Sequence, residues 1–238
     1  MVDDSDIIEN ADSVQTVADT EQSKRSVSIR DWLDLYTRPR VFFSSNIDLG
    51  ERAILLPIVW IIGISAQLDR IDTEIFSHEL GNTRASWDLY EPAITGSWGY
   101  FWGFCLTAGL LSGLIVYVVG GWWYRMRLRF SGAPEELDFS TPRHVYAWVS
   151  TIVSVPYVLL IVGFTFAYPN YYAAYHSDEL FSTLLPMLMF WSVAVSYVAA
   201  TTRFSLSGWK PMLWFMVLPA LFYLIVMGAL VFLMTLFT

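Results

Sequence analysis

The sequence contains one cysteine, three histidines and only 14 lysine and arginine residues, and each shortage excludes a class of protein. Because Cys105 stands alone, the chain can form neither an internal disulfide nor a thiolate metal site. The sequence has no Gly-rich phosphate loop, no GxSxG element and no grouping of serine, histidine and acid. We therefore expect no enzyme activity and no cofactor. Without a basic surface, nucleic acid is not an expected partner.

Acidic residues are unevenly distributed, and they dominate the start of the chain. The net charge is −8, and residues 1–27 contain seven acidic side chains: Asp3, Asp4, Asp6, Glu9, Asp12, Asp19 and Glu21. The same stretch has no aromatic residue and no helical or strand period, so we predict a disordered cytoplasmic tail over 1–27. The acidic excess belongs to this tail and does not indicate a binding surface.

Apolar residues make up 55% of the sequence and aromatic residues 17%, which predicts a membrane protein in a lipid bilayer. Segment 98–123 has no charge and carries tryptophans at both ends. It is long enough to cross a hydrocarbon layer of about 30 Å as a helix. Similar runs predict spans at 53–67, 145–168, 180–201 and 212–237. The expected fold is therefore all-α and polytopic, with a transmembrane domain of five helices over 49–238.

The arginines predict the orientation of these spans. Arg125, Arg127 and Arg129 form a basic loop directly after the second span, and such residues are retained in the cytoplasm. With the amino terminus inside, the outer segments contain only Arg70 and Arg84 among the basic residues. We therefore predict a cytoplasmic amino terminus and an outer carboxyl terminus.

Segment 28–48 contains a predicted amphipathic helix. Four apolar residues recur at helical spacing: Ile29, Trp32, Leu33 and Tyr36. Ser28 and Asp31 form a predicted capping box, and Pro39 should end the helix at or before Arg38. With Arg38 and Arg40 beside it, the segment suits the headgroup layer of an anionic membrane. It equally suits packing against the cytoplasmic ends of the bundle.

Glycines form one face of the second span. Five of them fall within an arc of about 120° on a helical wheel: Gly99, Gly103, Gly109, Gly113 and Gly120. A helix without side chains on one face can approach a neighbour backbone to backbone. This face predicts close packing, either against helices of the same chain or across a homo-oligomer seam.

The other four spans each contain one proline: Pro57, Pro156, Pro186 and Pro219. Each proline removes a backbone hydrogen bond and favours a kink, so these helices either line a transport path or are shaped to fit around the second span. No predicted span has an ionisable residue in its middle, which argues against a proton-driven transporter or an intramembrane metalloprotease. The hydroxyls of Ser150, Thr151, Ser154, Ser192 and Ser196 are expected to bond to backbone or to a neighbouring helix.

Histidines and acids occur together in two outer segments. His78 is followed by Glu79, and His176 by Asp178 and Glu179. Imidazole and carboxylate groups are good ligands for a divalent metal, but their spacing has no HExxH character. We predict no metal site.

Several elements together resemble the Ypt-interacting-protein (Yip) domain family. These are the LYTRPRVFF element, the basic loop closing in FSGAP, the third span HVYAWVSTIVSVPYVL and the last span LSGWKPMLWFMVLPALFYL. The sequence departs from the family pattern in DLYEP, which here precedes the second span and is expected outside. The resemblance therefore implies a prokaryotic-type member in a bacterial or archaeal cytoplasmic membrane, in preference to the Golgi or endoplasmic reticulum.

Two functions are expected from these features. The first is a non-enzymatic membrane scaffold or adaptor that binds other membrane proteins or itself, in membrane organisation or trafficking. The alternative is a transporter, a channel or an accessory transport subunit for a small neutral or lipidic substrate. The resemblance to a prokaryotic-type member does not imply the GTPase partners of eukaryotic Yip proteins for this chain.

Overall fold

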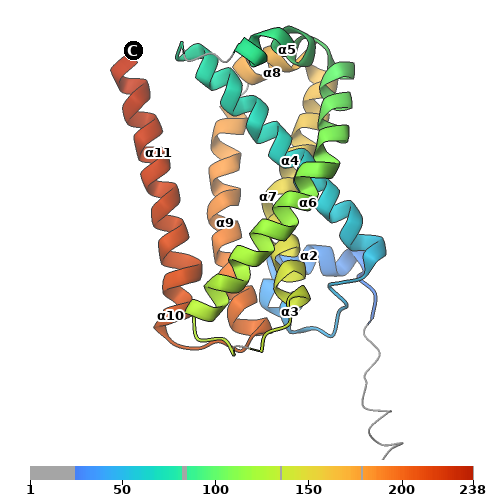
Figure 1. Cartoon of the computed structure of the whole chain (residues 1–238), viewed down its shortest axis with the longest axis vertical. Coiled ribbons are helices and arrows are strands. Elements are labelled where there is room, and N and C mark those ends of the chain that lie inside the picture. Colours follow the sequence, from blue (N-terminus) through green and yellow to red (C-terminus); the bar gives the residue numbers. More distant parts are fainter. Residues whose placement is uncertain (1–24, 82–84, 135, 178, 238) are drawn as a thin grey trace, which may run out of the picture.

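The computed structural model describes residues 25–81, 85–134, 136–177 and 179–237, and this part of the chain is helical (Figure 1). Two short helices come first, α2 (Ile29–Thr37) and α3 (Pro39–Ser44). The long helices are α4 (Arg52–Glu79), α6 (Trp98–Phe130), α7 (Ser140–Ala167) and α9 (Glu179–Arg203). A last rod consists of α10 (Trp209–Met212), the π-helix η1 (Leu213–Val217) and α11 (Leu218–Phe237). Helices α5 (Ala85–Gly96) and α8 (Tyr171–Ser177) lie together at one end of the bundle, and α2 and α3 lie at the other.

Among the described residues, five helices are long and apolar enough to cross a membrane. They are α4, α6, α7, the segment Leu184–Arg203 of α9, and the rod Trp209–Ala229. The predicted all-α fold with five membrane-spanning helices is confirmed. Residues 1–24, which make up most of the predicted tail, lie outside the described residues. Below, "the α2 end" and "the α5 end" name the two ends of the bundle.

Helix α4 is longer than the first predicted span, 53–67. It continues to Glu79, because Ile71 and Ile75 maintain the helical period and are buried against the neighbouring helices. The acidic residues Asp69 and Asp72 therefore lie within this helix, beyond the predicted span, whose middle contains no ionisable residue. The charged pair Asp69 and Arg70 does not end the helix, because the burial of its apolar face continues past them.

Helices α4 and α6 cross at a contact made by glycines (Figure 1). A Cβ added to Gly63 would lie 1.9 Å from the carbonyl oxygen of Gly109, and one added to Gly113 would lie 2.2 Å from that of Val59. Ser112 Oγ donates a hydrogen bond of 3.0 Å to the Gly63 carbonyl across the same contact. Only glycine allows two helix backbones to come this close.

The five glycines of α6 have different surroundings. Gly109 and Gly113 contact α4, and a Cβ on Gly120 would meet the Tyr146 ring of α7 at 2.2 Å. Gly99 and Gly103 are exposed, and a Cβ on Gly103 would meet nothing within 4 Å. Their arc of about 120° is wider than the strip that α4 covers, so the predicted face divides into an internal part and an outward part.

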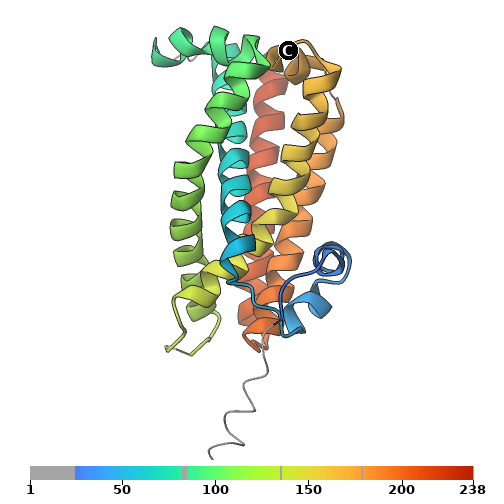
Figure 2. The same cartoon turned by 90° about the vertical axis from the view of Figure 1, so that its right-hand side faces the viewer.

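The segment that contains α2 and α3 packs against the ends of α7 and α9 (Figure 2). Leu35 is fully buried, the Trp32 ring lies 4.9 Å from that of Trp148, and the Tyr36 hydroxyl donates to the Thr151 carbonyl at 2.8 Å. Burial raises the pKa of Tyr36 to about 12. The sequence left two placements open for segment 28–48, the headgroup layer and the end of the bundle. These contacts match packing against the end of the bundle.

The opposite face of α2 is exposed. Ile29 is 83% and Leu33 63% accessible, so the predicted stripe of four apolar residues is divided between the bundle and the surroundings. The capping box is present, with the Ser28 N–H donating to Asp31 Oδ2 at 2.7 Å. The Arg25 guanidinium lies 2.6 Å from Asp31 and holds the pKa of that carboxyl well below its usual range.

Pro219 lies two residues after the end of the π-helix η1. The Leu218 N–H donates to the Leu213 carbonyl, and continuing this register would require an N–H at residue 219 for the Trp214 carbonyl. Proline has no N–H, so Trp214 accepts a hydrogen bond from the Arg127 side chain of α6, with Nε at 2.9 Å. The sequence predicted a kink at Pro219. In the structure the helix changes to a π-helix before this proline, and the Trp214 carbonyl that is left free joins η1 to α6 through Arg127.

Candidate functional site: a cavity between the helices

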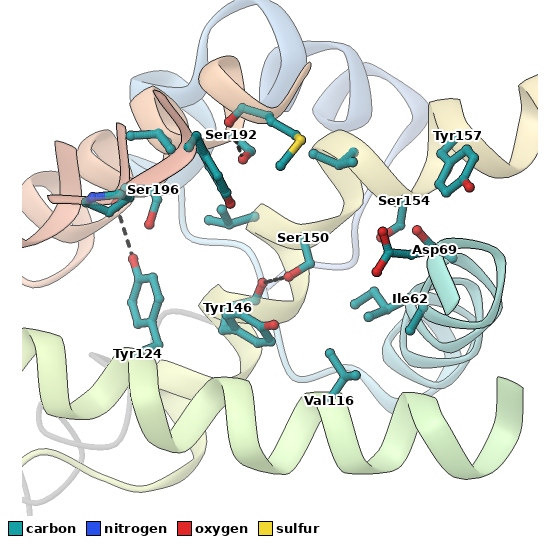
Figure 3. Close-up of a pocket in the computed structure, with 18 of the residues that line it drawn as sticks. Ile62, Asp69, Val116, Tyr124, Tyr146, Ser150, Ser154, Tyr157, Ser192 and Ser196 are labelled. Atoms are coloured by element: carbon teal, nitrogen blue, oxygen red, sulfur yellow. Dashed lines mark hydrogen bonds between the residues drawn. The ribbon is translucent and has the colours of Figure 1, made fainter. Parts of the chain in front are cut away.

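A cavity of about 350 Å³ lies between α4, α6, α7, α9 and α11 (Figure 3). Its volume falls at the lower end of the range of small-molecule sites. Apolar side chains from several of these helices form part of the wall, including Ile62, Val116 and Leu185. The α11 wall consists of Pro219 and Tyr223, and the rest of α11 leans away from α9 toward the α5 end (Figure 1).

Hydroxyl groups give the cavity its polar character. Nine hydroxyl-bearing residues line it: Ser65, Ser150, Ser154, Ser192, Ser196, Tyr124, Tyr146, Tyr157 and Tyr223. Several donate to backbone carbonyls, as the sequence predicted; Ser150 Oγ donates to Tyr146 at 2.9 Å and Ser192 Oγ to Met189 at 2.7 Å. A hydroxyl that donates in this way still has lone pairs that can accept. The wall therefore suits a ligand with both polar and apolar parts.

Arg127 lies at the α2 end of the cavity. Its Nε donates to Trp214, and its Cζ lies 4.2 Å from the centre of the Phe215 ring. Phe215 is fully buried and packs edge-on against Tyr124 at 5.0 Å, so the guanidinium is held on an aromatic base. Among the described residues, Arg127 Nη2 is buried and has no hydrogen-bond partner. A buried unpaired donor of this kind is rare in folded proteins.

The two neighbouring arginines of the basic loop have other surroundings. Arg125 Nη2 donates to the Leu137 carbonyl at 2.9 Å, and its Cζ lies 3.4 Å from the centre of the Phe139 ring. Arg129 is exposed. Of the three residues that the sequence singled out for topology, only Arg127 lines the cavity.

The opposite end of the cavity is acidic. Asp69 lies there beside Ser154 and Tyr157 and is exposed at the edge (Figure 3). One turn further along α4, Asp72 accepts hydrogen bonds from Tyr157 and Tyr171, both of which are buried. These three residues join α4 to α7 and α8. The sequence predicted no role for Asp72, and its position three residues after Asp69 was the only local signal that both lie on one helix face.

The remaining predicted residues lie away from the cavity. Pro57, Pro156 and Pro186 are inside α4, α7 and α9 but do not line it. Arg38 and Arg40 are exposed at the start of α3. Cys105 is fully buried at the α5 end, as expected for a small core residue.

The outer histidines form pairs with carboxylates. His78 Nδ1 lies 3.1 Å from Glu91, and Asp88 completes a group whose ligand atoms all lie within 4.8 Å of one another. His176 Nε2 lies 2.7 Å from Glu79. The predicted partners of His176, Asp178 and Glu179, lie outside the part of the chain whose side chains are described. These pairs join α4 to α5 and α8.

Fold and site together define a five-helix polytopic membrane protein with a cavity of mixed polar and apolar lining between its helices. Comparison with protein-family models, with curated proteins and with solved structures gives no match.

Proposed function

We propose that this protein is a non-enzymatic transporter, or an accessory transport subunit, for a small amphipathic molecule that binds in the cavity. The observation that carries the proposal is the cavity itself, a hydroxyl-lined space of about 350 Å³ between membrane-spanning helices. Polar side chains inside a bundle face the interior where a ligand passes or binds. The proposal follows the transport alternative raised by the sequence, with an amphipathic ligand.

The surroundings of the cavity support this proposal. Most described side chains of the fifth span are exposed, including Phe222 and Ile225, so this span presents an apolar surface to the surrounding lipid. We place the amino terminus and the α2 end in the cytoplasm, because the basic residues gather there. A bacterial or archaeal cytoplasmic membrane, and the resemblance to prokaryotic-type Yip proteins, remain part of the proposal.

Filling the cavity is expected to stop transport. Ser150→Phe would place a ring in the space beside Tyr146, so a ligand would no longer fit. The measurement is movement of a dye-labelled single-chain amphiphile across proteoliposome membranes, detected by dithionite quenching. The variant should show the rate of protein-free liposomes.

Leu159→Phe is the matched control, because Leu159 is on the same helix and 63% exposed. It should transport like the unmodified protein. Equal rates for the unmodified protein, the Ser150 variant and empty liposomes would refute the transport proposal.

A membrane scaffold is the second candidate, and the outward part of the glycine face favours it. Gly99 and Gly103 form an exposed GxxxG pair near the α5 end of α6. Such a pair allows a second helix to approach closely, from another copy of this chain or from another membrane protein.

Self-association through this pair is expected to be lost in Gly103→Leu. The measurement is the mass of the particle in mild detergent and the yield of crosslinked dimer in membranes. The unmodified protein should form dimers that the variant does not, because the added side chain holds the helices apart. A strictly monomeric unmodified protein, with no co-purifying protein under gentle conditions, would contradict the scaffold role.

A further inference from the structure

One cation in the cavity has no counter-charge among the described residues. Arg127 lines the cavity, and no carboxylate in the described residues forms an ion pair with it. The acid at the cavity edge, Asp69, is on α4 at the opposite end. Along α6, the cavity wall runs from Val116 through Tyr124 to Arg127, a rise of about 16 Å. A single ligand that spans this length would meet a cation at one end and an acid at the other.

Contacts within the bundle hold the Arg127 side chain in place. The hydrogen bond to Trp214 and the Phe215 ring use Nε and one face of the guanidinium. Among the described residues, Nη2 is buried and has no hydrogen-bond partner. Guanidinium groups hold carboxylate and phosphate oxygens through short charge-assisted hydrogen bonds. An oxyanion at this position would satisfy the orphan donor and neutralise the charge.

We infer that the ligand of the cavity is an anionic amphiphile, with its oxyanion headgroup on Arg127 and its apolar chain along the α9–α11 wall. This inference rests on the proposed function and specifies its ligand. Leu185, Met189 and Val193 supply apolar surface on α9. Asp69 repels an anion from the α5 end of the cavity, so the headgroup binds in one direction only.

Two pure ligands that differ only in the headgroup can test this inference. The probes are oleyl phosphate and oleyl alcohol, which share one chain. Equilibrium binding of each is measured to the full-length protein in phosphatidylcholine nanodiscs, with empty nanodiscs subtracted. The unmodified protein should prefer oleyl phosphate by about 10- to 100-fold.

Arg127→Gln should abolish this preference while oleyl alcohol still binds, which also shows that the variant is folded. Arg127→Lys should keep part of the preference, because it keeps the charge. Arg129→Gln removes an exposed charge from the same helix and should change nothing. If Arg127→Gln binds neither ligand, the lysine variant decides: a reduced preference for oleyl phosphate with oleyl alcohol binding intact supports the oxyanion site, and an unchanged preference counts against it.

Three results would overturn the inference. An unmodified protein that binds both ligands equally has no anion site, although the cavity still binds amphiphiles and the proposed function survives. An Arg127→Gln variant with an unchanged preference would place the anion elsewhere. Displacement of oleyl phosphate by equimolar inorganic phosphate would identify a free anion as the ligand. By contrast, binding of neither ligand, or binding that Ser150→Phe leaves intact, counts against the proposed function itself.

Discussion

Gly113→Leu is expected to prevent the five-helix bundle from assembling. A Cβ at this position would lie 2.2 Å from the Val59 carbonyl oxygen, which belongs to the backbone of α4 and cannot rotate away. The whole α4–α6 crossing would have to separate, and the loss of stability should exceed about 4 kcal/mol. The measurement is thermal unfolding in detergent, followed by reaction of Cys105 with a maleimide dye. This thiol is fully buried in the folded protein and reacts when the bundle opens.

Gly163→Leu is the control on another spanning helix, α7, where this glycine is exposed. An added side chain there meets nothing within 4 Å, so the unfolding temperature should remain within a few degrees of the unmodified protein. If both variants unfold at the same temperature, the glycine crossing does not hold the bundle together as described.

Asp72→Ala is expected to cause the second large loss of stability. The buried hydroxyls of Tyr157 and Tyr171 would both lose their Asp72 acceptor. Hydrogen bonds to a charged group contribute about 1.5–3 kcal/mol each, so a loss of about 3 kcal/mol or more is expected. Asp72→Asn retains one acceptor oxygen and should lose less. The same Cys105 assay applies, since Cys105 lies in the apolar cluster around these tyrosines.

Asp69→Ala serves as the control for this prediction, because Asp69 is on the same helix and exposed. It should leave the unfolding temperature nearly unchanged. A similar loss in both variants would show that removing charge from α4 matters more than the hydrogen bonds to the two tyrosines.

The membrane fold could be predicted from the sequence because it depends on local properties. A charge-free run with tryptophans at its ends, such as 98–123, predicts a spanning helix whatever surrounds it. The end of α4 could not be predicted in this way. Asp69 and Arg70 indicate an interface, yet the packing of Ile71 and Ile75 continues the helix beyond them.

The cavity could not be predicted because it depends on contacts between distant segments. Asp72 and Tyr157 are 85 residues apart, and Arg127 and Trp214 are 87 apart. The sequence showed Arg127 as one of three arginines with the same topological role. The Trp214 carbonyl, made available by Pro219, and the Phe215 ring distinguish it from Arg125 and Arg129. Likewise, nothing in the sequence distinguishes Ser150 and Ser192 from other serines of membrane helices. The packing of α7 beside α9 brings both into the lining of one cavity.

The glycine crossing also fixes how far one helix can slide along the other. At Gly63, Gly109 and Gly113 the two backbones touch, and Ser112 Oγ and Trp60 Nε1 donate hydrogen bonds of 3.0 Å to the Gly63 and Leu106 carbonyls across the same contact. Sliding one helix would separate these donors from their acceptors and would bring side chains into the space that glycine leaves open. The crossing therefore sets the positions of Asp69 on α4 and Arg127 on α6 relative to each other, and with them the length of the cavity.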